Sequence, residues 1–219
     1  MENVIPSPIG GLKRYLSDSR IDELYRKLGE RYSDVKLPAH GWDHISRTVA
    51  SAITIGEEEG ARMDIVVPSM LLHDIGFLSD PDPEGHHLRG AESSYGWTEL
   101  WSPEDRDAIA DCIARHKGEV EGFGTIPNSV EQRVVCDADM LEKIGYIGVM
   151  QGTRTFVEFG ESCRPKYRSL LEIAIHLGRE EEVKFYTTKG SMMAKDRGGS
   201  GLRSEIFRKA EEELRHYYR

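Results

Sequence analysis

The sequence predicts an all-α fold, and three observations support this prediction. Apolar residues recur at close to a 3.6-residue period in several segments, which is the spacing that gives a helix one buried face. Helix-start chemistry precedes one of these segments, where Ser102 is a candidate N-cap followed by Pro103. No segment alternates convincingly between apolar and polar residues, as a half-buried strand does. Together these patterns favour a bundle of helices.

The expected elements follow from the same patterns along the chain. Asp64 is expected to cap a short helix that runs through the Leu71–Asp74 stretch. The proline- and aspartate-rich segment 79–87 and the glycine-rich segment 118–127 are expected to be loops. The other helices are expected over residues 12–32, 40–56, 88–100, 102–116, 131–150, 153–178 (as one or two) and 202–218.

Length indicates a single domain over residues 1–219, with a core of about 20–180. The segment 189–201 has little periodicity and is expected to be mobile. The last helix, over 202–218, is amphipathic and highly charged. It is expected either to pack on the core or to pair with another subunit, so the sequence leaves the oligomeric state open.

Composition excludes several classes of protein. Hydrophobic residues make up 38% and charged residues 31%, as in a folded globular protein. The net charge of −9 argues against a general nucleic-acid binder, although a small anionic substrate is compatible if a metal supplies positive charge. The three cysteines, at 112, 136 and 163, are odd in number and lack CxxC spacing. With no signal peptide or membrane-spanning run in the sequence, a cytoplasmic location is expected.

Histidine and aspartate residues at three places in the chain indicate a metal site. His73 and Asp74 directly follow an apolar run, where an unpaired charge would be costly. His44 follows Asp43 upstream, and a downstream Asp-Ala-Asp ends at Asp139. Neutral imidazoles and carboxylates form a ligand set suited to Mn, Fe, Co, Ni, Mg or Zn. We therefore expect these groups to bind a divalent metal, and the sequence leaves open whether one or two ions are held.

The two aspartates of the downstream group must have different roles. Asp137 and Asp139 are two residues apart, and on a helix they point about 200° apart, so they cannot both face one ion. Whichever does not bind is expected to accept a hydrogen bond from a ligand histidine or to start a helix. Asp43 has a similar ambiguity, since an acid in the first turn of a helix needs no metal.

Other ionisable residues are weaker candidates. His116 continues the buried stripe of its helix, so a core histidine and a ligand are both open interpretations. His86 and His87 lie in a predicted loop, where one of them could reach a metal or a phosphate. Arg47 lies one turn after His44 and could meet an anionic substrate. The remaining basic candidates, which are more typical of surface charges, are Arg89, Lys117, Lys143 and Arg154.

Side-chain nucleophiles and phosphate-binding glycine loops have little support. The GEVEGFG segment lacks P-loop and GxGxxG spacing, and no serine lies in GxSxG. Cys136 lies in an apolar run and is expected to pack there. A water molecule activated by a divalent ion is the expected nucleophile, because such an ion lowers the pKa of water toward neutrality.

These residues resemble the HD-domain superfamily of metal-dependent phosphohydrolases, which is named for its His-Asp pair. DHISRTV, LLHDIG and ADMLEKIG look like the three ligand segments of that family, over about residues 20–180. CDADMLEKIGYIGVMQGTRTF and IARHKGE are further similar to a small bacterial and archaeal single-domain branch. HHLRGAE resembles an HxxxGA element in which His86 is the match and His87 replaces a frequent proline. The family's Ala-Asp-x-Leu pattern selects Asp139 over Asp137.

The resemblance implies an all-α HD-domain bundle with its metal site in a central cleft. It assigns the metal to His44, His73, Asp74 and Asp139, with manganese as the leading metal and Fe, Ni, Co, Mg and Zn as alternatives. It implies hydrolysis of a phosphoester or phosphoanhydride of a small molecule, with a nucleotide as the leading substrate.

The catalytic roles that follow are expectations of the same resemblance. Asp74 would also accept a proton from water, and His116 or Arg47 would neutralise the substrate or leaving group. His86 and His116 would supply a second metal site or a substrate contact.

Two other functions remain open on the same residues. Some HD proteins bind two irons with a similar six-residue set and oxidise carbon with O₂. A non-catalytic module that binds a nucleotide and keeps its metal is the third interpretation. Iron with an oxygen-dependent spectrum would favour the oxygenase, and tight nucleotide binding without turnover would favour the module.

Overall fold

The computed structural model describes residues 10–80, 82–119, 126–162, 169–179, 183–199 and 201–218. All regular structure in these ranges is helical, which confirms the all-α prediction. Cys163, part of the predicted 118–127 loop and part of the predicted 153–178 helices lie outside them. The elements in chain order are η1 (Gly10–Ser17), α1 (Ser19–Ser33), α2 (Trp42–Glu59), α3 (Met63–Leu72), η2 (Ile75–Leu78), α4 (His86–Ser94), α5 (Pro103–Arg115), α6 (Val130–Met140), η3 (Leu141–Lys143), α7 (Gly145–Ser162), α8 (Leu170–Leu177), α9 (Thr188–Asp196) and α10 (Gly201–Leu214).

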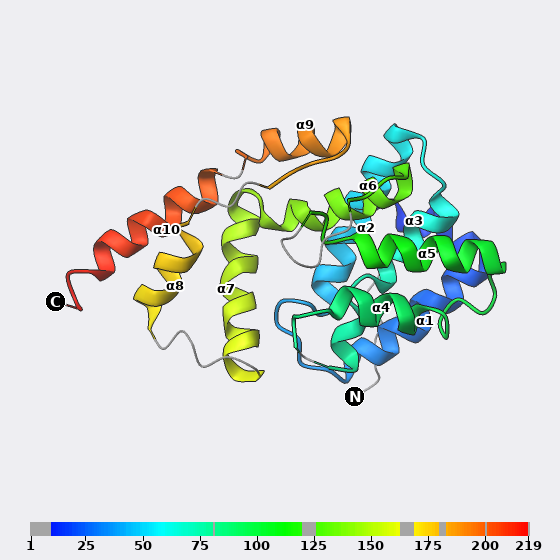
Figure 1. Cartoon of the computed structure of the whole chain (residues 1–219), viewed down its shortest axis with the longest axis horizontal. Helices are drawn as coiled ribbons and strands as arrows, with labels where there is room; N and C mark the ends of the chain where they lie inside the picture. Colours follow the sequence, from blue (N-terminus) through cyan, green and yellow to red (C-terminus); the bar gives the residue numbers. More distant parts are fainter. Residues whose placement is uncertain are drawn as a thin grey trace.

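The helices form two groups (Figure 1). Helices α1 to α6 lie together on the right of the view, and α7, α8 and α10 lie on the left. Helix α2 packs against α3 and α6, and α10 packs against both α7 and α8. Helix α9 returns to the first group and contacts α2 and α6.

The hydrophobic core lies within the first group. The predicted apolar stripe of α2 is buried there, with Ile45, Val49 and Ile53 each exposed by 1% or less. Helix α3 is buried over most of its length, from Ile65 to Leu72. Burying α3 fixes the end of that helix inside the protein, and this is where the predicted His-Asp pair begins.

Several helix boundaries differ from the prediction. The predicted 12–32 helix is divided, because Asp18 caps a new helix by accepting a hydrogen bond from the Arg20 backbone N–H. Asp64 lies in the first turn of α3, whose N-cap position is Arg62. Helix α4 begins at His86, after Gly85 in a left-handed conformation (φ 73°), and ends at Ser94. His86 and His87 are therefore helical, and the predicted 79–87 loop is shorter than expected.

The predicted 131–150 helix is broken. Helix α6 ends at Met140, and α7 starts at Gly145 with a φ of 65°, a backbone conformation that disfavours side chains. A Cβ at this position would also lie 2.5 Å from the carbonyl oxygen of Arg197. The apolar period continues across the break, so periodicity alone does not reveal it.

The segment expected to be mobile contains a helix instead. Helix α9 runs from Thr188 to Asp196 within the predicted 189–201 segment. Thr187 is its N-cap and accepts a hydrogen bond from the Gly190 backbone N–H at 2.9 Å. The helix was not expected, because a short capped helix needs little apolar periodicity when its start is fixed by side-chain hydrogen bonds. The mobility of the segment stays a prediction.

In the described part of the chain, no helix has both the length and the apolarity that crossing a bilayer requires.

Candidate metal centre

Six predicted residues meet where the ends of five helices converge. His73 is the C-cap of α3, Asp74 follows it, and His116 is the C-cap of α5. The other three lie within their helices near an end: His44 at the start of α2, His86 at the start of α4 and Asp139 at the end of α6. The side chains form two clusters of three ligand atoms, each cluster within 4.8 Å.

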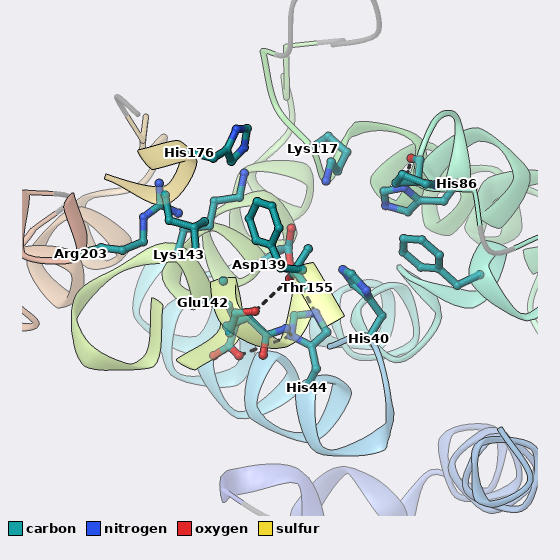
Figure 2. Close-up of a pocket in the computed structure, with 16 residues that line it drawn as sticks. His40, His44, His86, Lys117, Asp139, Glu142, Lys143, Thr155, His176 and Arg203 are labelled. Carbon is teal, nitrogen blue, oxygen red and sulfur yellow. Dashed lines mark hydrogen bonds and ion pairs between the residues drawn. The ribbon is translucent and has the colours of Figure 1, made fainter. Parts of the chain in front are cut away.

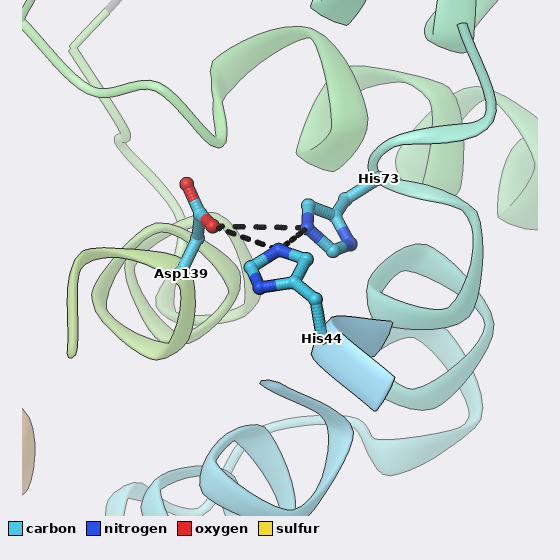
Figure 3. Close-up of side chains that lie close together, drawn as sticks. All are labelled: His44, His73 and Asp139. Atoms are coloured by element: carbon cyan, nitrogen blue, oxygen red, sulfur yellow. Dashed lines mark hydrogen bonds and ion pairs between the residues drawn. The ribbon is translucent and has the colours of Figure 1, made fainter. Parts of the chain in front are cut away.

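Cluster one consists of His44, His73 and Asp139 (Figure 3). The Nε2 atoms of the two histidines are 3.1 Å apart. Asp139 Oδ1 lies 3.5 Å from His44 Nε2 and 3.7 Å from His73 Nε2. The second carboxylate oxygen of Asp139 is directed away from both rings.

Cluster two consists of Asp74, His86 and His116. The Nε2 atoms of the two histidines are 3.3 Å apart. Asp74 Oδ1 lies 3.5 Å from His86 Nε2 and 3.8 Å from His116 Nε2. His116 is fully buried, and His86 and Asp74 are nearly so.

Asp74 joins the two clusters. Its Oδ1 atom faces cluster two, while Oδ2 lies 3.2 Å from the Nε2 atoms of both His44 and His73 in cluster one. The buried Oδ2 atom accepts no hydrogen bond. One carboxylate therefore presents an oxygen to each cluster, which is the arrangement needed to bridge two cations.

The hydrogen bonds of the rings direct lone pairs into the site. The Nδ1 atoms of His73, His86 and His116 lie 2.7–2.8 Å from the backbone carbonyls of Met70, Pro83 and Ile113. A carbonyl only accepts, so each Nδ1 carries a proton, and in the neutral ring the Nε2 then presents its lone pair to the site. Lone pairs 3.3 Å apart in cluster two repel each other unless a cation lies between them. The same inward lone pair is what a metal ligand needs.

His44 is held differently. Its Nδ1 lies 3.4 Å from Oε2 of the buried Glu142, which also accepts hydrogen bonds from Arg47 Nε at 2.9 Å and Nη2 at 2.6 Å. A carboxylate on the outer nitrogen of a ligand histidine fixes the orientation of the ring and raises its basicity.

The two clusters differ in their protonation. Burial lowers the pKa of His86 to about 3, with the nearby Lys117 ammonium acting in the same direction. Burial likewise lowers the pKa of His116 well below its usual value. Burial would also lower the pKa of His44, but the carboxylates of Asp139 and Asp74 outweigh it and raise that pKa well above normal. The pKa of Asp74 is low despite burial, because the facing histidines favour its charged form.

The residues present fit a divalent cation. They supply neutral imidazole nitrogens and ionised carboxylates, the donors that first-row divalent metals accept. An enclosed carboxylate oxygen without a hydrogen bond is costly, and a cation would remove that cost. Together with the family match below, the donor set indicates a divalent-metal site.

A cleft of about 240 Å³ opens onto the clusters (Figure 2). His44, His86 and Asp139 contribute to its wall from the metal centre. Phe77 forms part of the same wall and stacks on His40 and on His86, with ring centroids 4.3 Å apart in both pairs. Helices α7, α8 and α10 supply the opposite wall. The centre is thus accessible to a small molecule.

The other predicted residues lie at varying distances from the centre. Arg47 pairs with Glu142 and Asp43, and its Nη2 donates to Gln151 at 3.2 Å. Asp43 is exposed in the first turn of α2 and also pairs with Arg154 at 2.8 Å, which agrees with its interpretation as a helix N-terminal acid. The predicted contact of Arg47 with the substrate stays a prediction.

Asp137 has a structural role that neither sequence interpretation anticipated. It faces away from the clusters and accepts hydrogen bonds from the backbone N–H groups of Tyr186 and Thr187 and from the Thr187 hydroxyl, at 2.6–3.1 Å. It is therefore neither the first residue of a helix nor a partner of a ligand histidine in the described contacts.

The remaining basic and histidine candidates separate into two groups. Arg89 donates to the backbone oxygens of Asp80, Asp82 and Glu84 and so fixes the loop before α4. His87 is buried and does not line the cleft; the centroid of its ring lies 5.7 Å from that of His86. Lys117 and Lys143, by contrast, line the cleft, although the sequence favoured a surface position for both.

Sequence reasoning missed several residues of the site. Glu142 lies three positions after Asp139 within the motif quoted above, so helical spacing could have suggested it. His40 and Phe77 also lie within four residues of the ligands His44 and Asp74, so the same reasoning could have suggested them. The others reach the cleft through the packing of distant segments and had no local signal; they are Gln151, His176 and Arg203.

Comparisons with known proteins identify the class. The HD domain family model matches residues 41–144, a range that contains all six cluster residues. Residues 41–144 therefore match an HD domain, in agreement with what the motifs predicted.

One curated relative is YpgQ of Bacillus subtilis, an uncharacterized protein that is 31% identical over 111 residues. That alignment covers 50% of this chain and 54% of YpgQ, so the chain matches about half the length of this relative.

Solved structures extend the likeness to nearly the whole fold. The crystal structure of YpgQ has a TM-score of 0.59 and 21% identity, covering 90% of this chain and 96% of YpgQ. A structure of YpgQ in complex with ADP has a TM-score of 0.58 and 22% identity, with coverage of 89% and 97%. A predicted HD superfamily hydrolase from an uncultured Thermotogales bacterium has a TM-score of 0.58 and 21% identity, with coverage of 90% and 92%. At these identities the likeness establishes the shared fold.

Proposed function

We propose that this protein is a metal-dependent phosphohydrolase that cleaves a phosphoester or phosphoanhydride of a small molecule, with a nucleotide as the leading substrate. The observation that carries the proposal is the pair of clusters bridged by Asp74 at the wall of a cleft. Manganese is the leading metal on the family resemblance, and the mixed imidazole and carboxylate donors are compatible with it. We further propose that the protein acts in the cytoplasm.

The metal supplies one part of the chemistry and the chain the rest. Bound divalent ions lower the pKa of water and offset charge on phosphoryl oxygens. The four histidines and two aspartates would hold the ions. Lys117, which lines the cleft close to His86, binds a phosphoryl oxygen through its ammonium group. Walls formed by Phe77 and the C-terminal helices limit access of bulk water.

The proton acceptor is one of two aspartates. Asp74 was the candidate from the sequence, but each of its oxygens faces histidines of one cluster. Asp139 contributes Oδ1 to cluster one and lines the cleft, with 13% of its side chain exposed. Asp139 therefore has an oxygen available for the proton, and we propose it as the alternative acceptor. His116 is fully buried, so we propose that it acts as a metal ligand and does not touch the substrate.

Support for a nucleotide comes from a relative, whereas the volume of the cleft limits the size of the ligand. YpgQ has been solved in complex with ADP. A cleft of about 240 Å³ is small among ligand pockets, which commonly range from about 300 to 1,000 Å³. It therefore suits a single small molecule.

A second candidate is an oxygenase that uses two irons. Two clusters with a shared carboxylate favour it as much as they favour a two-metal hydrolase. The basic residues that line the cleft favour the hydrolase, because they match the charge of a phosphoryl group.

The test is anaerobic release of phosphate or pyrophosphate from a panel of nucleotides and phosphoesters with added manganese. Release that depends on the metal and is absent in Asp74→Ala would support hydrolysis and identify the substrate class. Lys117→Gln should raise KM more than it lowers kcat. Absence of release across the panel, together with iron and an oxygen-dependent visible spectrum, would replace the proposal by the oxygenase.

A further inference from the structure

We propose that Gln151, on α7, is a positioning residue for the metal ligand His44 and ties the wall of the cleft to the metal centre. The inference rests on the proposed function, since it takes His44 as a ligand of the cation used there. Gln151 is 8% exposed and lines the cleft. It lies beyond residue 144, where the HD domain match ends, so it is not part of the matched motifs.

The side-chain amide of Gln151 is held through both its nitrogen and its oxygen. Its Nε2 donates to the Ala39 backbone carbonyl at 2.6 Å, and its Oε1 accepts from Arg47 Nη2 at 3.2 Å. A carbonyl only accepts and a guanidinium only donates, so the amide cannot be reversed without losing both hydrogen bonds. These contacts fix the orientation of the amide and tie α7 to α2 and to the segment before it.

The fixed amide determines which neighbour can accept a hydrogen bond from His44. Gln151 Nε2 lies 3.4 Å from His44 Nδ1, and Glu142 Oε2 lies at the same distance from that nitrogen. An NH₂ group does not accept, so of these two neighbours Glu142 is the acceptor for the Nδ1–H group. A reversed amide would present its oxygen to the same N–H and compete with Glu142. With Nδ1 donating to Glu142, the neutral ring presents its Nε2 lone pair to the metal.

Gln151 also acts on Glu142 through Arg47. Arg47 Nη2 donates both to Gln151 Oε1 and, at 2.6 Å, to Glu142 Oε2. The Glu142 side chain is 3% exposed and lies beside His44 (Figure 2), so its position depends on the groups packed around it. The other acidic partner of Arg47 is Asp43, whose side chain is 63% exposed and therefore gives weak support. Gln151 is thus the buried group that holds the Arg47 guanidinium against Glu142 from α7.

The test compares the metal affinity of Gln151→Met with that of the wild type. Methionine has a similar length and shape but removes both hydrogen bonds. Competition with a chelator measures each manganese ion, and the ion lost in His73→Ala marks cluster one. That ion should bind about tenfold more weakly in Gln151→Met, at the lower end of the range for loss of a group that supports a ligand. The ion at cluster two should be unaffected.

Gln132→Met is the matched control. Gln132 is also 8% exposed, and its amide is likewise held at both atoms, since it accepts from the Asn128 backbone N–H at 2.7 Å and donates to Asp111 at 2.6 Å. It lies at the start of α6, at the opposite end of that helix from Asp139. The control should lower the melting temperature by an amount similar to Gln151→Met and leave the affinity of both ions unchanged.

Two further measurements separate positioning from a general loss of stability. In the zinc-loaded protein, which is diamagnetic, the nitrogen NMR resonance of His44 Nδ1 should shift in Gln151→Met and stay in place in Gln132→Met. Combining Gln151→Met with Glu142→Gln should weaken cluster one by less than the product of the two single effects, because both act through one network. Combining Gln132→Met with Glu142→Gln should give the effect of Glu142→Gln alone.

Two results would overturn the inference. One is a cluster-one affinity in Gln151→Met that equals that of Gln132→Met, and the other is an unchanged His44 resonance. If Gln151→Met does not fold, Gln151→Asn repeats both measurements, because its shorter side chain cannot reach Ala39 and Arg47 together. The proposed reaction is tested separately by phosphate release. Selective weakening of one ion without release leaves the role of Gln151 in place and removes the hydrolase, whereas release with unchanged metal affinity in Gln151→Met does the reverse.

Discussion

The two clusters of the metal centre are built in different ways. In cluster two, both histidines are oriented by carbonyls three residues earlier in the same segment. In cluster one, His73 is oriented in that manner, but His44 depends on Glu142, which is 98 residues away in the sequence. Cluster two is therefore determined mainly by local helix-end geometry. Cluster one also requires α2 and η3 to pack correctly.

This difference gives the clusters different charges in the absence of metal. The histidines of cluster two have lowered pKa values because burial disfavours their charged form. His44 of cluster one has a raised pKa, since facing carboxylates outweigh its burial. A cation entering cluster one must displace a proton from His44, whereas one entering cluster two meets neutral rings.

The largest effect on metal content and turnover is expected at Asp74, because this residue belongs to both clusters. Asp74→Ala removes an oxygen from each cluster, so both clusters should lose metal. Turnover should fall by more than about a hundredfold, because residues that only support a ligand already cost about 10–100-fold when they are removed. Metal content by elemental analysis and phosphate release measure the two effects. Full metal content in a folded Asp74→Ala protein would contradict the bridging role.

Separate removal of one histidine from each cluster should sharpen the comparison. His73→Ala and His86→Ala should each lower the metal content by about one ion per chain, if the centre holds two ions. Elemental analysis of both variants after identical dialysis is the measurement. A loss of both ions in either variant would show that the clusters do not bind independently.

A smaller effect, confined to cluster one, is expected for Glu142→Gln. The substitution weakens the support of His44 Nδ1, and such changes typically lower metal affinity by about 10–100-fold. Competition with a chelator should show one weakened ion and one unchanged. Glu57→Gln is the control. This glutamate lies at the other end of α2 from His44, and its Oε2 is 2.9 Å from Arg14 Nη2. Equal weakening of both ions would contradict the separate support of the two clusters.

The smallest effect, confined to cluster two, is expected for Phe77→Leu. Phe77 stacks on His86 with an interplanar angle of 20°. Loss of an aromatic pair worth about 0.5–1.5 kcal/mol should weaken binding at cluster two by about two- to tenfold. Phe207→Leu, at a buried phenylalanine on α10, controls for general loss of packing. A change at cluster one alone would argue against the assignment.

The residues of the metal centre that could be predicted from the sequence are those placed by local helix geometry. The six cluster residues lie in short motifs, and His116 was visible from the apolar stripe of its helix. Their neighbours within a turn, such as Glu142, were within reach of helical spacing. Arg203 was not, because its position depends on α8 and α10 packing against α7. The ligand roles of the six residues remain a prediction until metal is measured.

The helical fold was predictable, but its interruptions were less so. The all-α class followed from periodicity. Ser102 was correctly identified as the N-cap of α5, since its hydroxyl oxygen accepts a hydrogen bond from the Asp105 backbone N–H. The break before Gly145 was missed because apolar residues continue through it and only the positive φ marks the turn. The start of α9 was missed because it depends on a hydrogen bond to Asp137, which is 50 residues away. The single-domain organisation stays a prediction.

The contact between Asp137 and Thr187 bears on where this protein can be divided. Asp137 is fully buried, and the hydrogen-bond donors recorded for its carboxylate come from Tyr186 and Thr187. A fragment that ends at residue 144, with the family match, would keep the carboxylate and lose every one of those donors. Water would replace these donors at the uncovered carboxylate, so the fragment would lose the net contribution of each hydrogen bond, about 0.5–1.5 kcal/mol. The segment around Thr187 thus contributes contacts to the buried end of α6 that residues 41–144 alone do not supply.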